Sequence, residues 1–236
     1  MSYYKVPSPK EDARAVFEIL KRGGIAILPM SVGYGITAID PDALDRIFRT
    51  KQRQPHKRHA MVGSYFLHRD IHILPPKEVG MVKLLTVDLD LPLGIVAPYR
   101  SDHPIIQKLP PRLLAQSVVE GTLAMLVNGG ALLEELSRLA ALEQLPLMGS
   151  SANITGKGAK TVVEDIEPEI LEVADIVIDY GRQKFHHPRV SSTMIDFRTI
   201  KVVRYGACYD VIQDALRRFY GIELPDDPAT SILQSE

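Results

Sequence analysis

Two groups of residues in this sequence carry side chains that could bind and position an anion. The first is the stretch from Arg46 to Arg69, which contains seven Lys or Arg side chains and no Asp or Glu. The second is the run Gly149-Ser150-Ser151-Ala152-Asn153-Ile154-Thr155-Gly156, in which small hydroxyl and amide side chains follow an apolar segment. Cations that converge on one face suit a polyphosphate or a carboxylate, and a guanidinium adds a bidentate fork.

Within the basic stretch, Lys51 and Arg53 are two residues apart, so on an extended backbone their side chains project to the same side. A predicted helix precedes them and a short apolar strand from Ala60 to Val62 follows, which would fix both cations on a scaffold. The alternative is a solvated basic face, which is the usual explanation of a charge run. The spacing alone leaves both interpretations open.

The serine-rich run has a functional and a structural interpretation. Small polar side chains at the carboxyl end of a strand are where open α/β sheets bind ligands. An ordinary strand-to-helix turn capped by Asn153 would use the same residue types. In isolation the run favours the structural interpretation.

Three other features are weaker indications of a functional site. The segment Gly156-Lys157-Gly158-Ala159-Lys160-Thr161 lacks the glycine spacing of a phosphate-binding loop. His68 and His72 have the i, i+4 spacing of metal ligands, but no third ligand accompanies them. Cys208 has no obvious activating base, so we expect a structural role.

The elements that must position these side chains alternate between helices and short strands. Helical patterns are predicted over residues 9–22, from 41, and near 77–85, 131–142, 161–172 and 210–220. Strand-like apolar runs are predicted near 25–28, 36–39, 60–62, 93–97, 123–127, 145–148, 176–178, 193–195 and 201–203. Adjacent strands at both ends break strict βαβ order, so we expect a mixed sheet with helices packed on it.

Composition sets the outer limits. The 236 residues are 45% hydrophobic and 24% charged, which is typical of a globular protein that buries a large core. The formal net charge of -1 argues against a wholly basic nucleic-acid binder but allows a local patch. A single cysteine excludes an intramolecular disulfide, no apolar run reaches 18 residues, and the N-terminus lacks a secretory pattern. We therefore expect a soluble cytoplasmic protein, with a domain over residues 1–221 and a loose polar tail over 222–236.

Taken together, the motifs resemble those of the Sua5/YciO/YrdC family, in the family's order and over roughly residues 12 to 208. They are G-G-I-A-I-L-P, Y-G-I, Lys51-x-Arg53, S-S-A-N-I-T-G, A-D-I-V-I-D-Y-G, S-S-T-M-I-D-F and V-V-R-Y-G. The resemblance implies an α/β, YrdC-like, twisted mixed parallel/antiparallel sheet with helices packed on it and a concave basic surface. The best-known activity of the family joins L-threonine, bicarbonate and ATP into threonylcarbamoyl-adenylate, the first step towards the t6A modification of tRNA. Mg2+ is expected through the ATP phosphates, and members have also been linked to double-stranded RNA or tRNA.

The resemblance also implies roles for individual residues. A catalytic cluster around nucleotide and bicarbonate would comprise Lys51, Arg53, Ser151 and Asn153. Further contacts to the nucleotide would come from Lys57, Ser150, Ser192 and Arg204. The acceptor pocket would be lined by Met30, Val32 and Tyr34.

The sequence departs from the family where the amino-acid substrate is expected. The family commonly has P-T-D-T-V-Y-G-L, whereas this chain has Pro29-Met30-Ser31-Val32-Gly33-Tyr34-Gly35-Ile36. The P-G-P-x-T and R-x-P segments of the family are also replaced, by Leu91-Pro92-Leu93-Gly94-Ile95 and Leu126-Val127-Asn128-Gly129-Gly130. The leading hypothesis is therefore an ATP-binding enzyme that forms a carbamoyl-type adenylate on an amine other than threonine. The alternative is a double-stranded RNA- or tRNA-binding member without synthase activity.

Overall fold

The computed structural model of the chain describes residues 7–52, 59–185, 187 and 190–228. Its strands are β1 Ala26–Met30, β2 Gly33–Ala38, β3 Ala60–Gly63, β4 Leu93–Pro98, β5 Val118–Val119, β6 Thr122–Val127, β7 Met148–Ser151, β8 Ile176–Val177, β9 Met194–Asp196 and β10 Lys201–Arg204. The helices are α1 Pro9–Lys21, α2 Pro41–Thr50, α3 Tyr65–Ile71, α4 Pro76–Lys83, α5 Pro104–Gln107, α6 Pro111–Ala115, α7 Ala131–Leu142, α8 Pro168–Glu172 and α9 Tyr209–Tyr220. Two shorter turns are the π-helix η1 Leu84–Asp88 and the 3-10 helix η2 Val163–Asp165.

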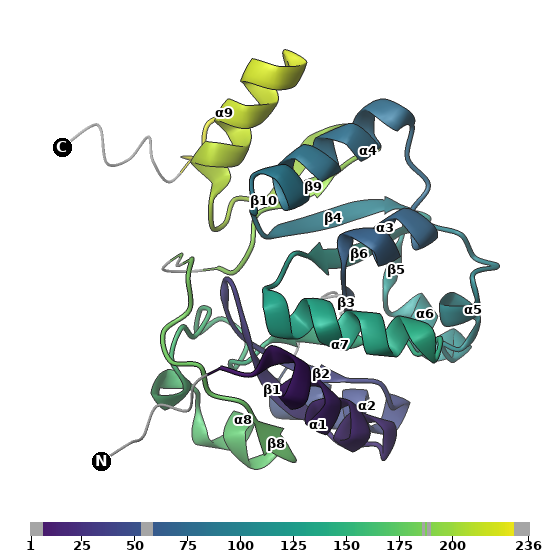
Figure 1. Cartoon of the computed structure of the whole chain (residues 1–236), viewed down its shortest axis with the longest axis vertical. Coiled ribbons are helices and arrows are strands. Elements are labelled where there is room, and N and C mark those ends of the chain that lie inside the picture. Colours follow the sequence, from purple (N-terminus) through teal and green to yellow (C-terminus); the bar gives the residue numbers. More distant parts are fainter. Residues whose placement is uncertain (1–6, 53–58, 186, 188–189, 229–236) are drawn as a thin grey trace.

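The described strands form one sheet in the order β10-β9-β4-β6-β3-β7-β2-β1-β8, and β5 extends β6 as a hairpin. Three neighbouring pairs are parallel, namely β1 with β8, β3 with β6 and β4 with β9, and the others are antiparallel. The sheet twists strongly between its two ends, and the helices lie on it in layers (Figure 1). This architecture confirms the predicted mixed α/β sheet; the concave basic surface stays a prediction.

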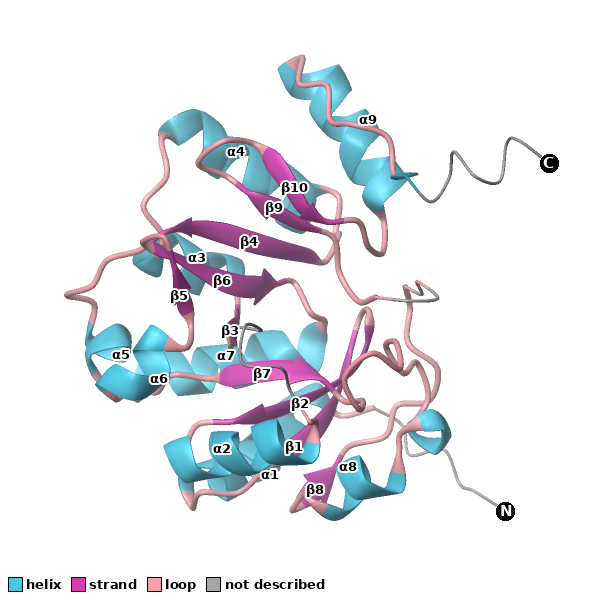
Figure 2. Cartoon of the chain, turned by 180° about the vertical axis from the view of Figure 1, so that it is seen from behind, coloured by secondary structure: helices cyan, strands magenta, loops and turns pink. Residues whose placement is uncertain are grey.

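The helices cover the two halves of the sheet differently. Helices α1 and α7 pack on each other and on β1 through an apolar cluster that includes Val16, Leu28 and Leu136. Helices α3 and α4 instead bury Ile71 and Met81 against β4, β6 and β9 in the larger core. Figure 2 shows β4, β6 and β9 from behind, and no helix of the described part of the chain lies over this face of the three strands. That open face is the position of the site described below.

Helix α2 has clear start and stop signals, and its end decides where Lys51 lies. The carboxylate of Asp40 accepts hydrogen bonds from the backbone N–H groups of Asp42 and Ala43, both at 3.0 Å, and Pro41 occupies the first helical position. The Lys51 N–H still donates to the Ile47 carbonyl at 2.9 Å, and Gln52 then turns left-handed with φ 49°. The backbone at residues 51–52 is therefore not extended, so the same-side argument for Lys51 and Arg53 is wrong at its first residue.

Three other sequence expectations differ from the structure. The helix predicted over 161–172 is divided into η2 and α8, since Pro168 cannot continue a helix that precedes it. The strand predicted at 145–148 is placed later, so Ser150 and Ser151 belong to β7 itself. The predicted loose tail over 222–236 begins with a packed segment, because Leu224 is buried and Gln213 donates to its carbonyl at 3.0 Å. Residues 229–236 lie outside the described residues, and for them the loose tail stays a prediction.

Candidate functional site

A cavity of about 560 Å3 lies on the open face of the sheet. Alternate residues of β4, β6 and β9 line it, namely Gly94, Val96, Ala124, Leu126, Met194 and Asp196. The residues between them, such as Ile95, Met125 and Ile195, are completely buried in the core on the other face. Because successive side chains of a strand point to opposite faces, one set lines the cavity and the other packs in the hydrophobic core.

Strand register aligns five cavity residues in one row across the sheet. Arg204 pairs with Met194, Met194 with Gly94, Gly94 with Leu126, and Leu126 with Val62. All five residues line the cavity. The row, which we call the Arg204–Val62 row, therefore begins with a cation on β10 and continues as an apolar surface to β3.

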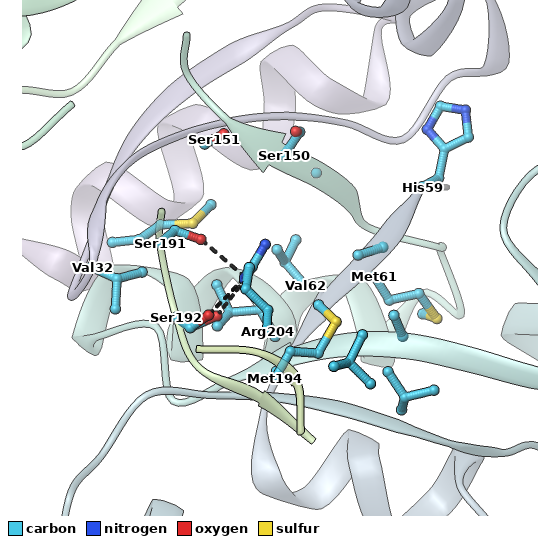
Figure 3. A pocket seen from close by; sticks show the side chains of 18 of the residues that line it. Val32, His59, Met61, Val62, Ser150, Ser151, Ser191, Ser192, Met194 and Arg204 are labelled. Atoms are coloured by element: carbon cyan, nitrogen blue, oxygen red, sulfur yellow. Dashed lines mark hydrogen bonds between the residues drawn. The ribbon is translucent and has the colours of Figure 1, made fainter. Parts of the chain in front are cut away.

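The cationic end of this row is built from Arg204 and two serines. The guanidinium donates from Nε to the Ser192 carbonyl at 2.9 Å, and from Nη2 to the Oγ atoms of Ser192 at 3.1 Å and Ser191 at 3.2 Å (Figure 3). No carboxylate within the described part of the chain pairs with it, and its burial lowers the pKa of Arg204 from the ordinary value. A desolvated cation without a counter-charge favours binding of an anion.

Ser150 and Ser151 line the cavity from β7, on the wall opposite Ser191 and Ser192 (Figure 3). Their strand is held by β2, with Ile36 opposite Ser150 and Gly35 opposite Ser151. The predicted contacts of Ser150, Ser192 and Arg204 with a nucleotide stay predictions, but the structure brings all three side chains to one cavity.

Lys51 lies behind the cavity rather than on its surface. It is 2% exposed, and its Nζ donates to the backbone carbonyls of Ser151 and Asn153, the latter at 2.5 Å. Its own carbonyl accepts from the Thr155 N–H at 3.1 Å. The lysine ammonium thus joins the end of α2 to the end of β7. The predicted catalytic role of Lys51 stays a prediction.

The remaining predicted cluster members are placed in part. Asn153 is 5% exposed and does not line the cavity; its Nδ2 donates to the Ile154 carbonyl at 2.6 Å, and its Oδ1 is buried with no hydrogen-bond partner in the described structure. Arg53 and Lys57 lie outside the described residues. Their predicted contacts with phosphate stay predictions.

The three residues expected around the acceptor all line the cavity. Met30 and Val32 present apolar side chains from the β1–β2 turn, and each is less than 5% exposed. The Tyr34 hydroxyl points away to the 179–181 turn, where it donates to Asp179 at 2.7 Å or the Gly181 carbonyl at 2.8 Å. Burial and the Asp179 hydrogen bond raise the pKa of this phenol well above its usual range.

Several cavity residues were not singled out from the sequence. Ser191 and the pair Asp196 and Arg198 are the main ones, and both carboxylate oxygens of Asp196 accept from Arg198, at 2.7–3.2 Å. The period-two pattern of residues 192, 194 and 196 could have found Asp196, because it predicts one shared face for Ser192, Met194 and Asp196. It gives no signal for Ser191.

Within the described part of the chain, no cluster of three or more His, Cys, Asp or Glu side chains could hold a metal ion. Magnesium bound through ATP stays a prediction. Cys208 is not activated, because burial raises the pKa of its thiol to about 11. The helices in the described ranges are also too short or too polar to cross a bilayer.

Comparison with known proteins identifies the family. A sequence model of the Sua5/YciO/YrdC family, described as "Telomere recombination", matches residues 18–206. The chain therefore belongs to the Sua5/YciO/YrdC family.

One curated relative and two solved structures illustrate the range of similarity. The "Putative threonylcarbamoyl-AMP synthase" of Methanocaldococcus jannaschii is 26% identical over 220 residues, covering 82% of this chain and 86% of the relative. The crystal structure of P. abyssi Sua5 complexed with L-threonine superposes with a TM-score of 0.71 at 20% identity, covering 94% of this chain and 61% of that one. E. coli YciO superposes with a TM-score of 0.61 at 22% identity, covering 86% and 92%. This chain thus spans less than two thirds of the length of the Sua5 chain, and these two structures support the fold alone.

Proposed function

We propose that this protein binds ATP in the cavity on the open sheet face and forms a carbamoyl-type adenylate from bicarbonate and an amine. The proposal includes a cytoplasmic location. The observation that carries it is the guanidinium of Arg204, which no carboxylate of the described residues pairs with and which Ser191 and Ser192 hold in a cavity whose opposite wall presents Ser150 and Ser151. A phosphate group would supply the missing negative charge, and four serines offer hydroxyl donors to its oxygens.

The chemistry asks little of the protein beyond positioning. The amine nitrogen attacks bicarbonate, water leaves, and a carbamate results. One carbamate oxygen then attacks the α-phosphorus of ATP, the bond to the β-phosphate oxygen breaks, and pyrophosphate leaves. Fixed cations and hydroxyls lower the barrier by holding the reactants in line and by stabilising charge on the phosphoryl oxygens.

In this proposal Arg204 contacts phosphate, while Lys51 acts through the β7 end that it holds. Arg53 and Lys57 would add positive charge from the segment that follows Lys51. The side-chain oxygen of Asn153, Oδ1, is buried without a partner in the described structure. In this proposal Asn153 supports the turn that follows Ser150 and Ser151. Magnesium would be bound by the phosphates of ATP.

We further propose that L-threonine is not the preferred acceptor. Where the family has T-D-T, this chain has Met30-Ser31-Val32, and Met30 and Val32 line the cavity. A threonine hydroxyl against these side chains would lose its partner, at about 1–3 kcal/mol for an unpaired buried polar group. Threonine would still bind weakly, because an apolar site barely rejects an added hydroxyl.

The decisive experiment is to incubate the full chain with ATP, Mg2+, bicarbonate and a pool of amino acids, and to identify new adenylates by mass while measuring pyrophosphate. We expect pyrophosphate release that requires both bicarbonate and an amine. No adenylate, combined with salt-sensitive binding of duplex RNA, would contradict the proposal and favour the RNA-binding alternative. A robust product with threonine, ahead of all other amines, would disprove only the statement about threonine.

A further inference from the structure

The Arg204–Val62 row places apolar surface directly beside the cation. Neighbouring strands lie about 4.8 Å apart, so Met194 is one strand spacing from Arg204, and Leu126 is three. A ligand whose anionic group binds Arg204 can therefore place a neighbouring apolar group on Met194, Gly94 and Leu126. Figure 3 shows Met194 and Val62 around the same space as Arg204.

The side chains of Met194 and Met30 fill gaps in the apolar surface along the Arg204–Val62 row. A Cβ atom on Gly94 would lie 3.1–3.2 Å from three side-chain atoms of Met194, so Met194 lies flat across the glycine. Met30 lies across Gly35 in the same way and belongs to the apolar cluster of Val62, against which Leu126 also packs. Unbranched thioether side chains can rearrange around ligands of different shape.

Two polar side chains beside this surface, Asp196 and Thr122, already have partners. Asp196 is the one acidic side chain among the described residues that line the cavity, and Arg198 binds both of its oxygens. The Thr122 hydroxyl donates to the Val119 carbonyl at 2.6 Å. A polar substituent placed on the Arg204–Val62 row would consequently be desolvated without a new partner, whereas an apolar one would gain contact area.

We infer that the acceptor amine carries a bulky apolar side chain, such as that of leucine, isoleucine or phenylalanine, which packs on Met194, Leu126 and Val62. This inference rests on the proposed function and names the substrate class of the same cavity. The other conceivable occupant of the row is the adenine base, and the test below separates the two.

The test measures acceptor binding without requiring catalysis. The full chain is saturated with α,β-methylene-ATP, whose α-phosphorus cannot lose a pyrophosphate group, and is titrated calorimetrically with leucine, phenylalanine, threonine and glycine in bicarbonate buffer. We expect leucine or phenylalanine to bind about tenfold or more tightly than threonine, the size of effect that an apolar pocket gives. Equal or tighter binding of threonine, or no binding of the apolar amino acids, would overturn the inference.

Two cavity variants and one surface control locate the effect. Leu126→Gln should weaken leucine binding about tenfold and change threonine binding by less than about threefold. Leu142→Gln, the same change at a position that is 70% exposed and away from the cavity, should change neither. Gly94→Ala should push Met194 into the cavity and weaken the larger acceptors more than glycine.

The variants also distinguish the two proposals. If Leu126→Gln weakens the analogue itself and leaves acceptor preference unchanged, the row binds the base and the inference is wrong. If apolar acceptors bind as expected but no amine gives an adenylate with ATP, the inference stands and the proposed chemistry fails.

Discussion

The side chain of Arg204 is suited to bind an anion but contributes little to the stability of the fold. Its guanidinium is desolvated, hydrogen-bonded only to neutral serine oxygens, and without a carboxylate in the described structure. Such a cation contributes little to folding, because the loss of hydration is not offset by an ion pair. We expect the same group to dominate binding of an anion.

The Arg204→Met variant tests whether Arg204 matters more for nucleotide binding than for folding stability. Nucleotide affinity should fall roughly ten- to a hundredfold, the value of a charge-assisted hydrogen bond of about 1.5–3 kcal/mol. The free energy of unfolding should change by less than about 1 kcal/mol, because the relief of a desolvated charge offsets the lost hydrogen bond to the Ser192 carbonyl. Calorimetry with ATP and urea denaturation measure the two, and Arg217→Met, on an exposed arginine paired with Asp214, is the control. A variant that unfolds easily yet binds nucleotide normally would refute the assignment.

Lys51 should behave in the opposite way. Its ammonium satisfies the carbonyls of Ser151 and Asn153, which lie 100 and 102 residues further along the chain. Lys51→Met leaves those two buried carbonyls unsatisfied, so we expect a loss of about 2–6 kcal/mol of unfolding free energy in urea, at about 1–3 kcal/mol for each group. Lys77→Met on the surface should stay within about 0.5 kcal/mol of the parent. A stable Lys51→Met protein without nucleotide binding would instead make Lys51 a direct ligand of phosphate.

At the scale of elements, a buried histidine pair joins α3 to β6. His72 Nε2 lies 3.1 Å from the Leu123 carbonyl, which can only accept, so Nε2 carries the proton and Nδ1 accepts. His68 must then donate from Nδ1, 2.8 Å away, which leaves its Nε2 as a buried acceptor without a partner in the described structure. The accepting Nδ1 makes the His72 ring neutral, and burial favours the neutral form of the His68 ring.

This pair predicts that acid weakens the fold. Burial lowers the pKa of His68 to about 4 and that of His72 to about 3, whereas both titrate near 6.5 when unfolded. The unfolded chain then takes up protons first, so stability is complete above about pH 6.5 and falls below it. Between pH 7.5 and 5.5 we expect a loss of about 2–3 kcal/mol in urea denaturation, using about 1.4 kcal/mol for each proton and pH unit.

Variants isolate the contribution of the pair. The double change His68→Leu and His72→Leu should flatten the loss between pH 7.5 and 5.5. His103→Asn, which keeps a cap for α5, should not change it. The same steep loss in the double variant would assign the acid sensitivity to other groups.

How much of the molecule the sequence predicts depends on the distance along the chain over which a signal acts. Apolar runs and caps predict most strands and helices, because these signals are local. The Arg204–Val62 row depends on the order β10-β9-β4-β6-β3, and no local sequence pattern shows which strands become neighbours. The position of Lys51 was missed for a related reason, since α2 continues to Thr50 and its end is fixed by contacts with residues 151–155.

On the scale of the whole molecule, the period-two pattern of β4, β6 and β9 has an evolutionary consequence. A substitution at 94, 124, 126 or 194 changes what the cavity accepts, whereas one at 95, 125 or 195 disturbs the core. Selection for a new substrate and selection against misfolding therefore act on different codons of the same strands. A lineage can change its ligand one mutation at a time while it keeps a foldable sheet throughout. The ligand should accordingly diverge faster than the fold. The substitutions that mark this divergence are expected at the alternate strand positions 94, 124, 126 and 194.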